Sequence, residues 1–408
     1  MNVKLDSVLL LSLVVPFIMS VSLSPRETPY WLFGLIFLGL LFYIIVDFLK
    51  LSRVIYEKIK RILLLSLIIG VIGSAFASAI IVRHQTYPTH QIHDMPLQQE
   101  IAIRFLLEGK NPYSTTYFGT FLEEWHYSDT EKNPALYHFV LMPVYILFAI
   151  PFYFVSNVML GFFDARMPLL FLFFSLLFLA SKFSIDEDKK RLFLILLAFN
   201  PATLPFMLEG RSDIFMYAFL FMGFYLLHKK RYGLGGIPMA VAFVVKQSAW
   251  PILPLYAAFM YLKTRSVQKT VMYFLPFMAT LALFVGPFAL WNTKAFYDST
   301  VGYLSGGIAT SYPISGYGLG KLLNQAGIIK DVHSYFPFQI LQILFGIPIL
   351  IVLFHFLRRR TNVQRLILAY GILLFVFWYL SRYFNNSHLG YLSMIFITAY
   401  FWPKDKSE

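Results

Sequence analysis

A histidine and an aspartate lie side by side in a polar stretch of an otherwise apolar chain. The stretch covers residues 83–135, and the pair is His93-Asp94. Three apolar residues follow at four-residue spacing: Leu97, Ile101 and Phe105. This spacing predicts an amphipathic helix that lies on a membrane surface and ends at Gly109. Asp94 is then a helix cap, a general base, or both, because its two carboxylate oxygens are separate acceptors.

Two more histidines lie shortly before this pair. His90 and His93 are three residues apart, His84 precedes them, and Asp94 follows them directly. Imidazoles and carboxylates are ligands that divalent cations accept in proteins. Loop histidines can equally be solvated side chains. The sequence therefore leaves a divalent cation possible and assigns no metal ligand.

Charged residues interrupt the apolar part of the chain at three later places. They are Glu209-Gly210-Arg211-Ser212-Asp213, Lys246, and the segment from Arg382 to His388. Charges this close to hydrocarbon are costly unless they are paired or functional. Arg211 can pair with Glu209 or with Asp213. Lys246, Arg382 and His388 are either interfacial anchors or contacts for an anionic group such as a phosphate.

The elements that must position these residues are membrane-spanning helices. The chain has 408 residues, of which 58% are hydrophobic and 13% are charged. Apolar runs of roughly 20 residues recur along it, and each is long enough to cross a bilayer. Backbone groups in lipid must be satisfied internally, so these runs must be helical. We therefore expect an all-α polytopic membrane protein with one integral membrane domain over residues 1–408.

The net charge of +13 comes from short clusters of Lys and Arg between the apolar runs. This is the pattern of cytoplasmic loops in membrane proteins, so we expect no nucleic-acid partner. The chain has no cysteine, which excludes disulfides and thiolate metal sites.

Placing these clusters in the cytoplasm predicts where the chain crosses the membrane. The predicted spans lie near residues 7–24, 31–49, 62–82, 192–207, 213–228, 235–247, 250–262, 270–291, 336–357, 366–381 and 390–402. Residues 136–181 must cross an odd number of times, as three short helices or as one span with a re-entrant segment, which gives roughly 12 to 14 spans in total. Both termini are then cytoplasmic, and the loops 83–135 and 292–335 are extracytoplasmic. The short pair 235–247 and 250–262 is typical of helices that border a cavity.

In their order and spacing, the motifs resemble the GT-C superfamily of glycosyltransferases that use polyprenyl-phosphate sugars. The most similar branch is the bacterial and archaeal mannosyltransferase-like one. The resemblance covers most of residues 84–262 and is carried by His93-Asp94, Glu108-Gly109-Lys110-Asn111-Pro112-Tyr113, Asn133-Pro134-Ala135-Leu136-Tyr137, Asn200-Pro201 with Glu209–Asp213, and Gly235-Gly236 with Lys246-Gln247. The chain departs from the family pattern at His93, where many relatives have a second acid, and at Pro134, where many have paired prolines.

The resemblance implies a fold, an activity and a set of site residues. The fold is a GT-C-like helical bundle in the plasma membrane, with 83–135 as the catalytic loop. The activity is inverting transfer of a hexose, such as mannose, from a polyprenyl-phosphate donor to a glycan or glycolipid acceptor on the extracytoplasmic face. Asp94 is implied as the general base, and the substrate-binding residues are His93, Arg211, Asp213, Lys246, Arg382 and His388. The cations among them would stabilise the departing phosphate.

Two other functions fit a polytopic protein of this kind. A flippase or transporter of lipid-linked oligosaccharides should have acids in mid-span and repeat symmetry. A polysaccharide polymerase shares the lipid-linked donor but relies on outer-loop arginines. The charged groups of this chain gather on one predicted face, which favours the glycosyltransferase.

Overall fold

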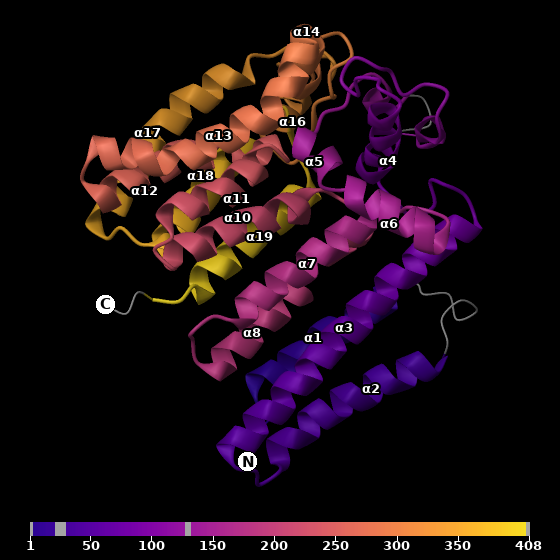
Figure 1. The fold of residues 1–408 in the computed structure, drawn as a ribbon, viewed down its shortest axis with the longest axis vertical. Helices are drawn as coiled ribbons and strands as arrows, with labels where there is room; N and C mark the ends of the chain where they lie inside the picture. The colour runs from indigo at the N-terminus through magenta and orange to yellow at the C-terminus, as the bar shows by residue number, and fades with distance from the viewer. Residues whose placement is uncertain (1–2, 21–29, 127–131, 405–408) are drawn as a thin grey trace.

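The computed structural model describes residues 3–20, 30–126 and 132–404, and these residues are mostly helical (Figure 1). The first helices are α1 (Leu5–Ser20), α2 (Tyr30–Ile45) and α3 (Arg53–Gln85). They are followed by α4 (Asp94–Leu107), α5 (Pro143–Leu147), α6 (Ile150–Leu160), α7 (Arg166–Ser181), α8 (Glu187–Ala198) and α9 (Leu204–Leu208). The central helices are α10 (Asp213–His228), α11 (Tyr232–Phe243), α12 (Ile252–Thr264), α13 (Val267–Trp291) and α14 (Thr293–Tyr297). The last are α15 (Tyr303–Ser305), α16 (Leu319–Gln325), α17 (Phe338–Arg359), α18 (Val363–Tyr379) and α19 (Asn386–Phe401). The predicted all-α class is confirmed.

Short turns and one small bridge complete the secondary structure. Tight 3-10 turns cover Val46–Phe48, Phe121–Glu124, Pro134–Leu136 and Gln247–Ala249, and a π turn covers Asp298–Gly302. Strands β1 (Ser315–Gly316) and β2 (Tyr383–Phe384) pair in parallel, with Ser315 opposite Tyr383. The bridge ties the loop 292–335 to the turn between α18 and α19.

Five helical segments are long and apolar enough to cross a membrane, within the ranges that the structure describes. They are Trp31–Phe48, Arg53–Gln85, Pro143–Leu160, Val267–Trp291 and Phe338–Arg359. Shorter apolar helices accompany them, among them α7, α10, α11 and α18. Of the predicted short pair, α11 has 12 residues and α12 has 13. The total number of crossings stays a prediction.

The segment 136–181, whose path the sequence left open, contains three helices. Pro151 lies in the first turn of α6, where its missing N–H costs no hydrogen bond. Helix α6 ends at Gly161, which is left-handed with φ +77°, and α7 begins at Arg166. The chain over 136–181 therefore follows the first of the two predicted paths as far as its helices are concerned, with three short helices.

Helix α4 differs from the prediction in its surroundings. Its residues Pro96 to Ile103 are all buried, so it packs inside the protein and does not lie on a membrane surface. The reason is that its polar residues Gln98, Gln99 and Glu100 bond to neighbouring segments. The predicted C-terminal cap is present: Gly109 has φ +75°, and the N–H of Lys110 donates to the carbonyl of Phe105 at 2.8 Å.

Buried ion pairs hold both ends of α3. Near its start, Nζ of Lys60 lies 2.7 Å from Oδ1 of Asp47. Near its end, the Arg83 guanidinium donates to both carboxylate oxygens of Glu100, at 2.8 and 2.9 Å, and to Asp164 at 2.8 Å. Arg166 lies 2.8 Å from the same Asp164 carboxylate. Helix α3 therefore continues to Gln85, beyond the predicted end at residue 82, and Glu100 fastens α4 to it.

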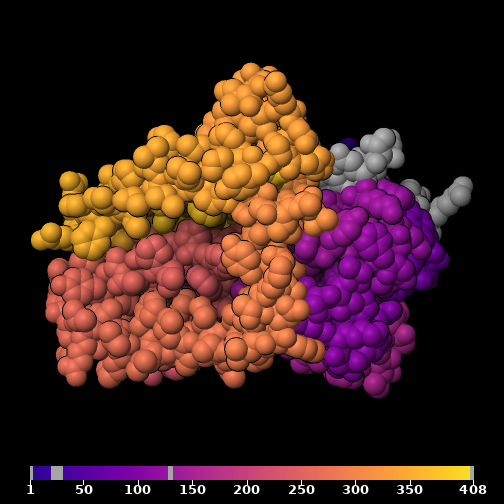
Figure 2. Space-filling model, turned by 90° about the horizontal axis from the view of Figure 1, so that it is seen from above, coloured from indigo at the N-terminus to yellow at the C-terminus, as the bar shows by residue number. Residues whose placement is uncertain are grey.

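Part of the second loop projects from the body of the molecule, and we call residues 315–335 the outer projection. It is the orange part at the top of Figure 2, where it extends beyond the neighbouring helices. Its small separate core is formed by Ile314, Ile329 and Phe338.

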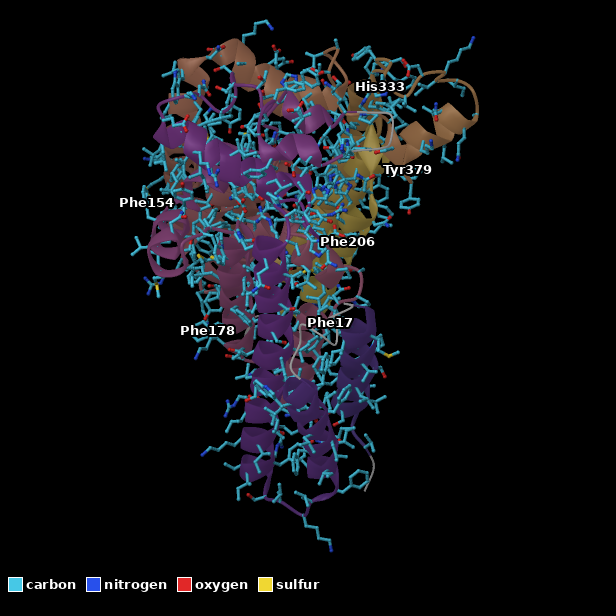
Figure 3. All side chains as sticks on the ribbon, turned by 90° about the vertical axis from the view of Figure 1, so that its right-hand side faces the viewer. Phe17, Phe154, Phe178, Phe206, His333 and Tyr379 are labelled. Carbon is cyan, nitrogen blue, oxygen red and sulfur yellow. The ribbon has the colours of Figure 1, made fainter. Side chains whose placement is uncertain are left out.

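Large apolar side chains cover much of the outside. Phe154 and Phe178 are 52% and 60% exposed and lie at the edge of the molecule in Figure 3. This outside is what a bundle surrounded by lipid presents.

Candidate functional site

The predicted site residues meet around one cavity of about 380 Å³. It lies between α4, residues 300–312 of the second loop, the α11–α12 turn and the α18–α19 turn. Six of the seven predicted residues line it: His93, Asp94, Arg211, Lys246, Arg382 and His388. The seventh, Asp213, lies behind Lys246 and bonds to it.

Asp94 is the first residue of α4 and lies in the cavity wall. Its Oδ1 is 2.5 Å from Nδ1 of His93, and its Oδ2 accepts a hydrogen bond from Nδ2 of Asn133 at 3.1 Å. Burial favours the protonated carboxyl, but the contacts with His93 and Asn133 outweigh it and hold the pKa of Asp94 below its usual value. The carboxylate is therefore ionised near neutral pH and can accept a proton.

His93, and not Asp94, caps the N-terminus of α4. Its Nδ1 lies 3.3 Å from the N–H of Met95 and also 2.5 Å from the Asp94 carboxylate. A ring nitrogen cannot accept from the amide and donate to the carboxylate at once. Protonation of Nδ1 therefore replaces the helix cap with a charged hydrogen bond to Asp94. The backbone N–H of His93 donates to the carbonyl of Glu209 at 2.8 Å, which fixes the start of α4 against the α9–α10 turn.

Sequence reasoning missed two glutamines in the cavity wall. Nε2 of Gln98 donates to the carbonyls of Ala135 and His138 at 2.6 and 2.7 Å. Nε2 of Gln247 donates to those of Val140 and Thr300 at 2.7 and 3.0 Å. Both glutamines bind main chain of the segment before α5, so they set the position of that wall. The feature of the sequence that could have identified them is their spacing from predicted site residues. Gln98 follows Asp94 by one helical turn, and Gln247 adjoins Lys246.

Lys246 and Arg211 each have an acidic partner. Nζ of Lys246 lies 2.6 Å from Oδ1 of Asp213, and these side chains are 10% and 7% exposed. Nε of Arg211 lies 3.0 Å from Oε2 of Glu209. The terminal nitrogens of Arg211 have no hydrogen-bond partner among the described residues. Arg211 therefore keeps hydrogen-bond donors available at the cavity, whereas the ammonium of Lys246 is held in a buried ion pair with Asp213.

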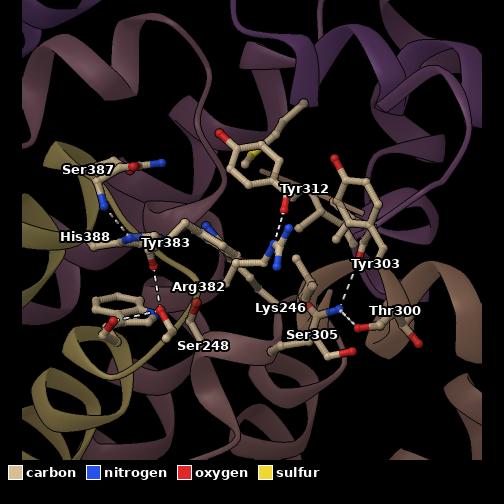
Figure 4. A pocket seen from close by; sticks show the side chains of 18 of the residues that line it. Lys246, Ser248, Thr300, Tyr303, Ser305, Tyr312, Arg382, Tyr383, Ser387 and His388 are labelled. Carbon is tan, nitrogen blue, oxygen red and sulfur yellow. Dashed lines mark hydrogen bonds between the residues drawn. The ribbon is translucent and has the colours of Figure 1, made fainter. Parts of the chain in front are cut away.

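Arg382 is buried and holds the second loop over the cavity. Its guanidinium donates to the main-chain carbonyl of Tyr312 (Figure 4). It also donates to the carbonyls of Val332 and Ser334, both at 2.8 Å. Burial lowers the pKa of Arg382 from its usual value, and Asp331 partly opposes this. The side chain predicted as a phosphate contact thus also clamps the outer projection.

His388 caps α19 from within the helix. Its Nδ1 accepts the N–H of Asn385 at 3.0 Å, and its ring lies 4.3 Å from that of Trp378. Nδ1 must be unprotonated to accept that bond, so His388 presents a neutral ring to the cavity.

The side chains that line the cavity carry more positive than negative charge, and one side of the lining is apolar. Among the described residues of the lining, Asp94 is the one carboxylate, and the cations are Arg211, Lys246 and Arg382. The apolar side includes Phe338 of α17 and Phe377 of α18, and the Phe377 side chain is 38% exposed. The cavity therefore suits an anionic ligand that carries an apolar group.

The three histidines considered for a divalent cation have separate surroundings. His84 stacks on Phe162 with ring centroids 3.9 Å apart, His90 meets Tyr87 edge-on, and His93 contacts Asp94. Within the residues that the structure describes, no group of three His, Asp or Glu side chains is placed to hold a metal ion.

No known protein family, curated protein or solved structure matches this chain.

Proposed function

We propose that this chain is a multi-pass glycosyltransferase of the plasma membrane. It would move a hexose, such as mannose, from a polyprenyl-phosphate donor to a glycan or glycolipid acceptor. The observation that carries the proposal is the cavity lining, in which the ionised carboxylate of Asp94 lies among three cationic side chains. A base and an anion-binding wall are the two elements that this transfer needs.

Each charged group has a defined part in the proposed reaction. The acceptor hydroxyl attacks the anomeric carbon while Asp94 takes its proton. The bond from that carbon to the phosphate oxygen breaks, and its electron pair leaves with the lipid phosphate. Arg211, whose terminal nitrogens have no hydrogen-bond partner among the described residues, is the best-placed cation for that phosphate, and Lys246 adds charge from the same wall. Attack opposite the leaving group inverts the anomeric carbon.

The donor and the acceptor would reach the cavity from different sides. The apolar side between α17 and α18 suits the polyprenyl chain, which would lie in the bilayer. The loops around α4 would face the extracytoplasmic solution and admit the acceptor, with both termini in the cytoplasm.

The test is sugar transfer by the purified protein in lipid nanodiscs with a panel of polyprenyl-phosphate sugars. Asp94→Asn should lower the transfer rate by about 10²–10⁴-fold, the usual contribution of a general base. Glu108→Gln is the matched control, because Glu108 is an exposed acid at the end of the same helix and should leave the rate unchanged.

Two results would overturn the proposal. The first is transfer by Asp94→Asn at the wild-type rate. The second, measured with the protein in closed lipid vesicles, is movement of an intact lipid-linked sugar across the bilayer with no glycosidic bond formed, which would support the transporter instead. Transfer that joins whole lipid-linked oligosaccharides would support the polymerase.

A further inference from the structure

The outer projection, residues 315–335, exposes apolar side chains that the proposed reaction does not use. Four large ones are exposed: Tyr317 (61%), Leu322 (48%), Ile328 (66%) and Tyr335 (61%). We propose that the outer projection rests on the lipid headgroup layer beside α17. The inference depends on the membrane insertion contained in the proposed function, and it adds a lipid-binding surface outside the spans.

The residue types on the projection suit a boundary between lipid and water. Tyrosine has an apolar ring and a polar hydroxyl, and it is enriched at membrane interfaces. Lysine can lay its apolar stem along lipid while its ammonium reaches the headgroups. The projection contains both types, with Lys321 and Lys330 against the single acid Asp331. Its charge therefore favours phosphate headgroups.

The projection is firmly attached to α17, which is one of the helices long enough to span a membrane. Its core packs Ile314 and Ile329 against Phe338, the first residue of α17. The Arg382 guanidinium holds the carbonyls of Val332 and Ser334 from the other side. The exposed face of the projection therefore keeps a fixed orientation relative to the span.

Exposed apolar surface continues from the projection into α17. Ile340, Ile343 and Leu344 are 63%, 60% and 60% exposed, and Ile340 follows Tyr335 by five residues. The outer projection extends beyond the neighbouring helices at the top of Figure 2, next to α17. Lipid around α17 would therefore also lie beneath the projection. The headgroup layer is then what the exposed face of the projection contacts.

The test uses nitroxide labels, because the chain has no native cysteine to compete for them. Single variants Ile328→Cys and Leu322→Cys probe the projection. Ile343→Cys is the lipid reference on α17, and Lys110→Cys is the water reference on the first loop. Each labelled protein is reconstituted in vesicles of phosphatidylcholine and phosphatidylglycerol, and its collisions with oxygen and with a water-soluble nickel chelate are compared.

We expect the oxygen-to-nickel ratio at residues 328 and 322 to lie severalfold above that at residue 110 and below that at residue 343. Ratios at 328 and 322 equal to that at 110, with 343 in lipid, would overturn this inference alone. A water-like ratio at 343 would overturn membrane insertion and the proposed function with it. Exclusion of both reagents at 328 and 322 would mean that protein covers the projection, which also refutes the inference.

Discussion

Removing one member of the Lys246–Asp213 pair should destabilise the protein strongly. The two charged atoms are 2.6 Å apart and nearly buried. At an effective dielectric constant of about 20, their attraction over that distance is roughly 6 kcal/mol. Much of this offsets the cost of taking both charges out of water. When a single partner is removed, the other charge stays buried alone, which typically costs about 3–5 kcal/mol.

A double-mutant cycle measures this coupling. Lys246→Met, Asp213→Asn and the double variant are melted in one detergent and followed by tryptophan fluorescence. Each single variant should lower Tm by about 5 °C or more, and the double variant should lose much less than the sum. The matched control is the exposed pair Lys110–Glu108, whose charged atoms are 2.7 Å apart but whose side chains are 55% and 54% exposed. Its cycle should give a coupling below about 1 kcal/mol.

The pair contributes no such coupling if Lys246→Met has the same Tm as the wild type, or if the Tm losses of the two single variants add up to that of the double variant. The charge of Lys246 would then be available to an anionic group, which is one of the two roles that the sequence left open for it.

Three further predictions follow from the site. The pKa of Asp94 is held low by His93 and Asn133 against the effect of burial, so the stabilising contribution of its carboxylate is present above about pH 3.9 and is lost as the pH falls through the lower pKa of the folded state. The Tm difference between wild type and Asp94→Asn should therefore shrink on acidification below that pH. A difference that grows contradicts the assignment. Gly316→Ala should open the β1–β2 bridge and speed proteolysis of the outer projection, because the new Cβ would lie 2.1 Å from the carbonyl oxygen of Phe384. Gly109→Ala is the control: Gly109 has a similar positive φ, but no heavy atom lies within 4 Å of the new Cβ. This variant should lower the free energy of unfolding only by the left-handed strain of about 1–2 kcal/mol. Arg382→Lys should also speed proteolysis between residues 312 and 334, because one ammonium cannot replace a planar guanidinium that binds three carbonyls, and unchanged cleavage would show that the clamp is dispensable.

The sequence predicted the helical class and the set of residues around the cavity, because both depend on features readable along the chain. Apolar runs located the long apolar helices, and the charges that interrupt these runs pointed to the cavity. The partners of those charges were not predictable. Asp213 pairs with Lys246, 33 residues later, and nothing local to either residue distinguishes that partner from Arg211.

Local patterns also misled where tertiary contacts decided the outcome. The spacing of Leu97 and Ile101 is correct for an amphipathic helix, but Glu100 binds Arg83 and fastens α4 inside the protein. Arg382 was predicted as a phosphate contact, and its three carbonyl partners lie in a loop some 50 to 70 residues earlier in the chain. Only the assembled structure shows that one residue both lines the cavity and holds its cover.

The polar side chains of α4 impose an order on the biogenesis of this protein. Gln98 needs the carbonyls of Ala135 and His138, and Glu100 accepts the N–H of Ala165. All of these partners follow α4 in the chain, the last of them by about 60 residues, so α4 cannot settle until they have emerged. Arg382 is made later still. The cavity therefore closes near the end of synthesis, and a nascent chain truncated before residue 382 carries Asp94 in an open site.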